Sequence, residues 1–259
     1  KALENGGVCI PKGYILKNHF AVMDLLANNN WERPVYFAVT TGPDSYLGLQ
    51  DYFRLEGLAY RLVPIKYPNT DNPNAIGGVA TDLMYNNIMD NWGWGGMDNT
   101  EEGIYMDENN RRMVTNIRLQ MSNLAEALIN EGKGEAALEV LEKVIDVTPE
   151  KNVPLTRVML PIQESLAMLA TADTMKSPFG ADGSPEMQAR AADRLRNLTL
   201  AMFEQQESEI DYYLSLEPGF YSAVRGEKDI ALQVADRLQR ITTFYLPGDE
   251  TLEILSTRL

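Results

Sequence analysis

The residue types best suited to ligand chemistry gather in one short segment. Trp92 and Trp94 alternate with glycines, and Tyr85 precedes them on a predicted helix. Flat aromatic rings stack on the apolar faces of sugars, and glycine lets a ligand approach the backbone. Asp98 and Asn99 follow the glycines and are the nearest polar groups that could orient a sugar or a peptide. The segment is therefore a candidate binding site. The alternative is that the two indoles pack between the parts of the chain, since large aromatics mostly serve packing.

Acidic residues in the same region could supply other chemistry. They are Asp98, Glu101, Glu102, Asp107 and Glu108. Their spacing fits no calcium-binding loop, so a solvated acidic loop is the simpler interpretation. Carboxylate pairs for glycoside hydrolysis are easy to find by chance among 37 Asp and Glu residues. We therefore assign no catalytic residue, no metal ligand and no cofactor.

Two further residues carry chemistry in isolation. Arg33 follows Glu32 at the start of a predicted strand, and it is either an anion-binding residue or part of an ion pair that positions the strand. His19 is the single histidine, and no second His, Cys or Ser arrangement accompanies it. A nucleophilic triad is not supported, and we expect His19 to lie partly exposed on a helix surface.

Composition excludes several classes of protein. The chain has 259 residues, with 23 Lys and Arg against 37 Asp and Glu, a formal charge of −14. Nucleic acids and anionic membrane surfaces repel such a chain, because both are bound mainly through Lys and Arg. The single cysteine, Cys9, excludes an intramolecular disulfide. No apolar run is long enough to span a bilayer. The chain opens Lys1-Ala2 without a Met or a leader pattern, so we expect a processed protein or a fragment.

The elements that must position these residues fall into two compositional regions. Residues 1–110 are rich in Gly, Asn, Pro and aromatics, and they predict a small α/β unit with a long ordered loop. The expected elements are a helix over 16–27, strands over 34–40 and 59–65, and short helices over 47–53 and 81–89. Asn28, Asn29 and Asn30 are expected to end the first helix, because Asn tolerates the left-handed conformation.

Residues 111–259 are rich in helix formers and predict an α-helical array. Apolar stripes on both sides of Gly132 predict a helical hairpin over 114–149, with Ala125 and Ala137 buried where the helices approach. This spacing matches the tetratricopeptide pattern, although the consensus aromatic positions are absent. Further helices are predicted over 161–170, 186–216 and 228–245, with an enlarged turn over 177–185 and a short helix after Asp249. The fold class is thus mainly α, a tetratricopeptide-like helical-hairpin array with a small α/β N-terminal unit.

Several stretches together resemble a known family. They are Pro11–Asn18, Asn29–Phe37, Tyr46–Leu49, Leu55–Pro64, Tyr85–Met89, Trp94–Asp98 and Tyr105–Met113. In order along nearly the whole chain, they resemble the Bacteroidota DUF2723 membrane proteins, classed as family 117 glycosyltransferases and related to protein O-mannosyltransferases. The resemblance implies that a multi-pass membrane region precedes this segment and carries the glycosyl transfer. It also implies an extracytoplasmic, periplasmic location on the inner membrane.

Two functions from different classes follow. The first is a non-catalytic soluble accessory domain that binds protein or glycan for a membrane glycosyltransferase-like protein, with the membrane region of its own parent as partner. The second is an autonomous soluble carbohydrate-active enzyme that uses the acidic residues near Trp94. An upstream coding sequence with many membrane spans favours the first.

Overall fold

The computed structural model of the chain describes residues 15–67, 76–171, 184–216 and 221–258. The chain divides into two compact units, Lys1–Asn91 and Trp92–Leu259, and each is described by itself. This division lies ahead of the compositional change after residue 110. The predicted domains, 1–110 and 111–259, stay a prediction. Cys9 and most of the turn predicted over 177–185 lie outside the described residues.

The first unit is built on a small mixed sheet. Its strands are β1 (Val35–Ala38), β2 (Phe53–Leu55), β3 (Ala59–Leu62) and β4 (Gly78–Val79). They lie in the order β1-β3-β2-β4, and β3 runs antiparallel to both β1 and β2, while β4 runs parallel to β2. Helix α2 (Thr81–Asn86) follows and continues as a π-helical turn, η3 (Asn87–Asn91), which confirms the helix predicted over 81–89.

An aromatic cluster fills one face of this sheet. Phe37, Phe53 and Tyr60 come from three different strands and point to the same side, because alternate residues of a strand share a face. Tyr46 packs edge-on against Phe53 with the ring centroids 5.0 Å apart. Burial raises the pKa of Tyr60 to about 12.

The short helix predicted over 47–53 is wrong. The segment instead holds one 3₁₀ turn, η2 (Gln50–Tyr52), and then enters β2, while another 3₁₀ turn, η1 (Pro43–Ser45), precedes it. Leu47 has φ 53° and Gly48 has φ 75°, so the backbone is left-handed at two successive residues. A right-handed helix cannot pass through that conformation, although the side chains are good helix formers.

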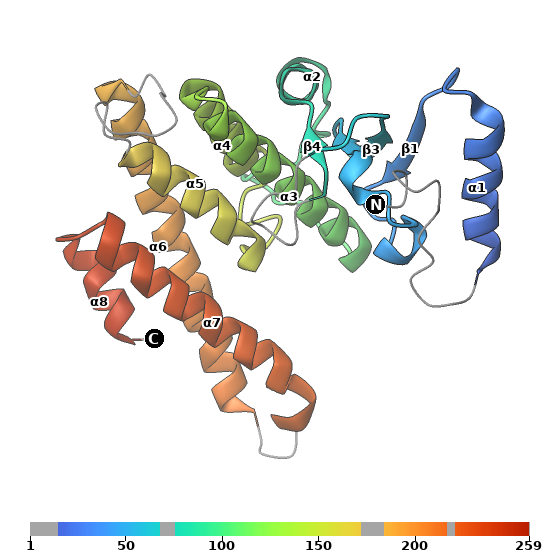
Figure 1. Cartoon of the computed structure of the whole chain (residues 1–259). Coiled ribbons are helices and arrows are strands. Elements are labelled where there is room, and N and C mark those ends of the chain that lie inside the picture. Colours follow the sequence, from blue (N-terminus) through green and yellow to red (C-terminus); the bar gives the residue numbers. More distant parts are fainter. Residues whose placement is uncertain (1–14, 68–75, 172–183, 217–220, 259) are drawn as a thin grey trace. The chain divides into compact units, whose positions relative to one another are not determined.

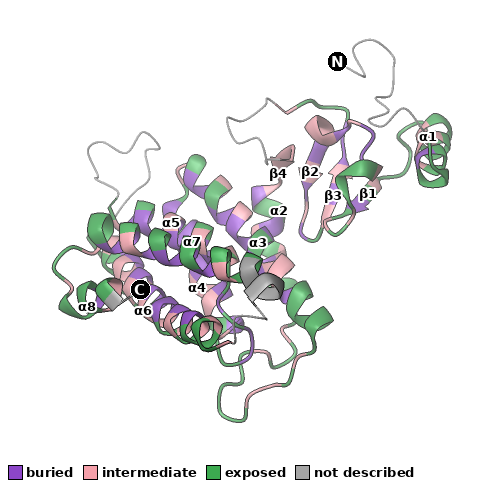
Figure 2. Cartoon of the chain, turned by 90° about the horizontal axis from the view of Figure 1, so that it is seen from below, coloured by how far each residue is buried: buried purple, intermediate pink, exposed green. Residues whose placement is uncertain are grey.

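Helix α1 (Lys17–Asn29) is confirmed, and Asn30 ends it in the left-handed conformation with φ 47°. The predicted exposure of His19 is wrong, because His19 is the one buried residue among those described in α1, at 4% exposure. Its Nδ1 accepts a hydrogen bond from the Leu16 N–H, so Nε2 carries the proton and donates to the Asp44 carbonyl at 2.8 Å. Phe20, on the predicted apolar face, is 60% exposed, and most of α1 is exposed in Figure 2.

The regular structure of the second unit is helical wherever the chain is described. Its elements are α3 (Glu108–Asn130), α4 (Gly134–Val147), η4 (Arg157–Met159), α5 (Leu160–Ala170), α6 (Pro185–Ser215), α7 (Tyr221–Tyr245) and α8 (Glu250–Arg258). Each predicted helix of this region is present, and α7 begins several residues earlier than expected. Figure 1 shows α3 and α4 as neighbouring antiparallel helices. Within the described ranges, no helix combines the length and apolar character needed to cross a bilayer.

The α3–α4 hairpin is confirmed in its details. The chain reverses at Gly132, whose φ of 77° suits glycine. Ala125 and Ala137 are both fully buried, so the two helices approach over small side chains as the sequence predicts. The chain is therefore mostly helical with one small mixed sheet.

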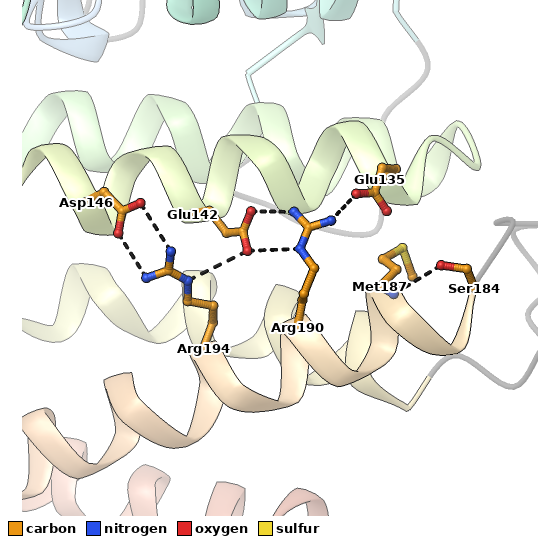
Figure 3. Close-up of polar contacts among 7 residues, drawn as sticks. All are labelled: Glu135, Glu142, Asp146, Ser184, Met187, Arg190 and Arg194. Atoms are coloured by element: carbon orange, nitrogen blue, oxygen red, sulfur yellow. Dashed lines mark hydrogen bonds and ion pairs between the residues drawn. The ribbon is translucent and has the colours of Figure 1, made fainter.

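A row of ion pairs joins α4 to α6 (Figure 3). Arg190 binds Glu135 and Glu142, which raises the pKa of its guanidinium. Arg194 binds Asp146 at 2.9 Å and lies 3.7 Å from Glu142. Because Glu142 is shared by two arginines, the pairs form one connected network between α4 and α6.

Candidate functional site

The loop that carries the predicted site opens the second unit. The N–H of Met97 donates to the Trp94 carbonyl at 3.1 Å, and the N–H of Asn99 donates to the Gly96 carbonyl at 3.0 Å. Gly95 and Gly96 have φ values of 60° and 78°, which L side chains rarely adopt. The two overlapping turns therefore depend on the glycines that separate the indoles from Asp98.

Two adjacent residues after α4 anchor this loop. Asn152 is 5% exposed, and its amide group donates to the carbonyls of Met97 and Asn99 at 2.7 and 2.9 Å. Its Oδ1 accepts from the N–H of Ile104 at 2.8 Å. Lys151 Nζ donates to the Glu101 carbonyl at 2.9 Å and to a neighbouring carbonyl. The backbone of the loop is thus held by donors from the connection between α4 and η4.

That connection is itself held by a buried cation, Arg118 of α3. Its guanidinium donates to the carbonyls of Thr148, Val153 and Pro154 and to the Thr148 hydroxyl, at 2.6–3.0 Å. The residue is fully buried, and burial lowers its pKa to about 10. Arg118 lies between Val114 and Met121 on the apolar stripe of α3, a polar residue at a core position that sequence reasoning missed.

The two tryptophans lie against each other. Their ring centroids are 5.8 Å apart at an interplanar angle of 58°, and both side chains are half-buried. The Nε1–H of Trp94 is buried and has no hydrogen-bond acceptor among the described residues. A half-buried pair leaves ring area open to a ligand and also contributes packing, so both predicted roles remain open.

The polar candidates differ in what they already bind. The Asp98 side chain is exposed at the tip of the loop. Asn99 is also exposed, but its Oδ1 accepts from the N–H groups of Glu101 and Glu102 at 3.0 and 3.4 Å. Asp98 is therefore the polar group of this pair best placed to meet a ligand, while Asn99 stabilises the loop.

Tyr85 and Arg33 belong to the first unit. Tyr85 is half-buried on α2. Arg33 is exposed, and its backbone N–H and carbonyl both bind the Asn29 side chain, at 3.3 and 2.7 Å. The structure thus joins Trp92, Trp94, Asp98 and Asn99 in one loop, and the other two candidates belong to a different unit.

The acids after the loop have structural partners. Asp107 caps α3 by accepting from the N–H of Asn110 at 2.8 Å, and Glu108 pairs with Arg112. Among the described residues, no cluster of three or more His, Cys, Asp or Glu side chains could hold a metal ion.

A second polar cluster, on the open face of the sheet, was not predicted. Glu56 follows β2, and its side chain is 5% exposed. Arg54 donates to Glu56 Oε1 through Nε at 2.8 Å and also through Nη2. The Tyr36 hydroxyl donates to Glu56 Oε2 at 2.9 Å. Arg61 lies 3.7 Å from the same carboxylate. The hydrogen bond to Glu56 raises the pKa values of Tyr36 and Arg54. The alternation of polar residues was visible in the sequence, but the strand register was not.

The protein is mostly helical with a small mixed sheet, and part of its sequence matches the model of a known family. Residues 3–83 match the family model of TMEM260-associated domain 2. This family is linked to TMEM260, a protein O-mannosyltransferase-like membrane protein. The matched stretch contains the sheet and its polar cluster and ends before Tyr85. No curated protein and no solved structure matches the chain.

Proposed function

We propose that this chain is a non-catalytic accessory domain of a membrane glycosyltransferase-like protein and that it binds glycan or protein through the loop of Trp92 and Trp94. The anchored loop carries this proposal. Preorganised loops lose little conformational entropy on binding, because their backbone is already ordered. Here Asn152 and Lys151 hold the backbone, while ring area and the Asp98 carboxylate remain accessible.

The parent of the proposed type is a DUF2723, family 117 glycosyltransferase-like protein of Bacteroidota, with this chain on the periplasmic side of the inner membrane. The match of residues 3–83 to TMEM260-associated domain 2 supports an association with such a membrane protein. In this proposal, the membrane region of the parent performs the transfer, and the domain orients an acceptor.

The helical unit is proposed to be tetratricopeptide-like. The α3–α4 hairpin, with Ala125 and Ala137 fully buried, supports this assignment. In repeats of this kind, successive hairpins stack and expose one extended surface to a protein partner. The array would then receive the acceptor protein while the tryptophan loop contacts its glycan.

The test is tryptophan fluorescence of the purified chain titrated with a mannose trisaccharide and with an unfolded acceptor peptide. We expect saturable quenching by one of the two, with loss of binding in Trp92→Ala and Trp94→Ala. Trp31→Ala is the matched control, because Trp31 is 57% exposed and lies outside the loop. Quenching that survives both loop variants, or no quenching by either probe, refutes the proposal.

The same preparation decides between binding and turnover. We expect the mannose trisaccharide to be recovered intact after prolonged incubation. Cleavage that is abolished by Asp98→Asn but kept by Asp90→Asn, an exposed acid of the first unit, would establish the carbohydrate-active enzyme instead.

A further inference from the structure

The open face of the sheet carries a row of side chains set by strand register. Tyr36 pairs with Arg61, Arg61 pairs with Arg54, and Arg54 pairs with Gly78. Residues that pair directly across strands point to the same face, so these four positions form one line across β1, β3, β2 and β4. With neighbouring strands about 4.8 Å apart, the line is roughly 14 Å long.

Two positive charges stand directly opposite each other in this line. Like charges at paired positions destabilise a sheet. Glu56 compensates only one of them, so Arg54, Arg61 and Glu56 together carry 2 − 1 = +1 in a chain of charge −14. Among the described residues, the Arg61 side chain makes no hydrogen bond, and its nearest acid is Glu56 at 3.7 Å. The guanidinium of Arg61 therefore has donors available for an anion.

Aromatic rings close both ends of the line. Tyr36 is 48% exposed, and its hydroxyl is fixed on Glu56. At the other end, Tyr67 lies on Gly78, and a Cβ at that glycine would stand 2.2 Å from the Tyr67 ring. Because Gly78 has no side chain, the Tyr67 ring occupies the space that a side chain at this position of β4 would fill. Tyr36 is exposed and Tyr67 is partly exposed, and they lie at opposite ends of the line that holds the two guanidinium groups.

We propose that this row, formed by Tyr36, Arg61, Arg54 and Tyr67, is a binding site for a negatively charged sugar. The anion sits on Arg61 and the outer edge of Arg54, and the sugar rings stack on the tyrosines. A negatively charged group complements the net positive charge of the cluster. Glu56 holds Arg54 and Tyr36 in place before the ligand arrives. The carboxylate of a uronic acid and a sugar phosphate share this chemistry.

The test is calorimetric titration of the whole chain with three probes: trigalacturonic acid, glucose 1-phosphate and the neutral maltotriose. We expect one of the charged probes to bind with a Kd of about 1 mM or tighter, and the preferred probe identifies the source of the charge. Binding should weaken as salt is raised, because exposed charges are screened. Equal binding of maltotriose, or no binding of either charged probe, overturns the proposal.

Variants separate this site from the tryptophan loop and from a structural ion cluster. Arg61→Gln should weaken binding about tenfold or more, since a charge-assisted hydrogen bond is lost. Arg240→Gln is the control with the same charge change, on an exposed arginine of α7. Glu56→Gln should lower the melting temperature yet strengthen binding, because the cluster then carries +2. If Glu56→Gln binds the probe more weakly even at a temperature at which the variant is folded, the proposal is overturned. An unaltered Kd in Arg61→Gln overturns it as well.

Discussion

Replacement of Arg118 by Met tests whether a buried cation holds the second unit together. Methionine keeps most of the apolar volume and removes every donor. The buried carbonyls of Thr148 and Val153 then lose their partner, and the bonds to the part-buried Pro154 carbonyl and to the Thr148 hydroxyl are lost as well. An unpaired buried acceptor costs about 1–3 kcal/mol and each of the other two hydrogen bonds contributes about 1 kcal/mol, so the total loss is roughly 6 kcal/mol.

The loss is partly offset because the charge is no longer buried. Burial lowers the pKa of Arg118 to about 10, which corresponds to about 3 kcal/mol of desolvation. The free energy of unfolding should therefore fall by about 3 kcal/mol in Arg118→Met. Arg118→Lys should also lose stability, because an ammonium cannot reproduce the planar fork that reaches all four acceptors.

Urea denaturation followed by tryptophan emission provides the assay. Arg240→Met is the control, since Arg240 is exposed and its pair with Asp236 contributes less than about 0.5 kcal/mol. A loss below about 1 kcal/mol in Arg118→Met would refute the reasoning, as would a gain of stability. Either result would mean that the carbonyls find water or that desolvation outweighs the hydrogen bonds.

Three further predictions follow from the structure. Ala137→Leu should destabilise the chain by about 1–3 kcal/mol in the same assay, because Ala137 is fully buried against α3; an unaltered midpoint would contradict the close approach of the helices. Tyr60→Phe tests alkaline stability: the raised pKa of Tyr60 contributes stability that is complete below pH 10 and is lost as pH rises to 12. The difference in unfolding free energy between the parent chain and the variant should therefore shrink by about 3 kcal/mol over that window, and a constant difference would exclude the assignment. Asn152→Ala should increase acrylamide quenching of the loop tryptophans, whereas Asn130→Ala, at an exposed helix end, should not; equal quenching in both would show that Asn152 does not hold the loop.

The helices of the second unit could be predicted from local patterns. The stripe that includes Met121 and Leu128 fixes the buried face of α3, and Gly132 marks the turn. Such signals are reliable because the backbone hydrogen bonds of a helix join residues only four apart in the sequence. Arg118 was visible on the same stripe, but its partners lie about thirty residues further on, in a connection that has no periodicity.

The first unit was less predictable because its structure depends on contacts distant in the sequence. β1 pairs with β3 rather than with its nearest strand in the sequence, so the alignment of Tyr36 with Arg61 appears only once the strands are paired. Left-handed Leu47 gives no compositional signal, and helix propensity therefore misled the prediction for its segment. The buried His19 likewise has a distant partner, because its ring hydrogen-bonds the Asp44 carbonyl, 25 residues further along the chain.

The way in which Arg118 holds its loop bears on how this protein can change during evolution. Three of its four acceptors are main-chain carbonyls, which every residue type supplies. Side chains at Val153 and its neighbours can therefore be exchanged without loss of the contact, while the arginine cannot. Selection on these carbonyl contacts therefore acts on Arg118 itself, whereas Thr148 and Asn152 are constrained by contacts of their own side chains. An exposed residue of the connection, such as Pro154, can then be substituted without loss of its contact to Arg118, because the main-chain carbonyl stays in place.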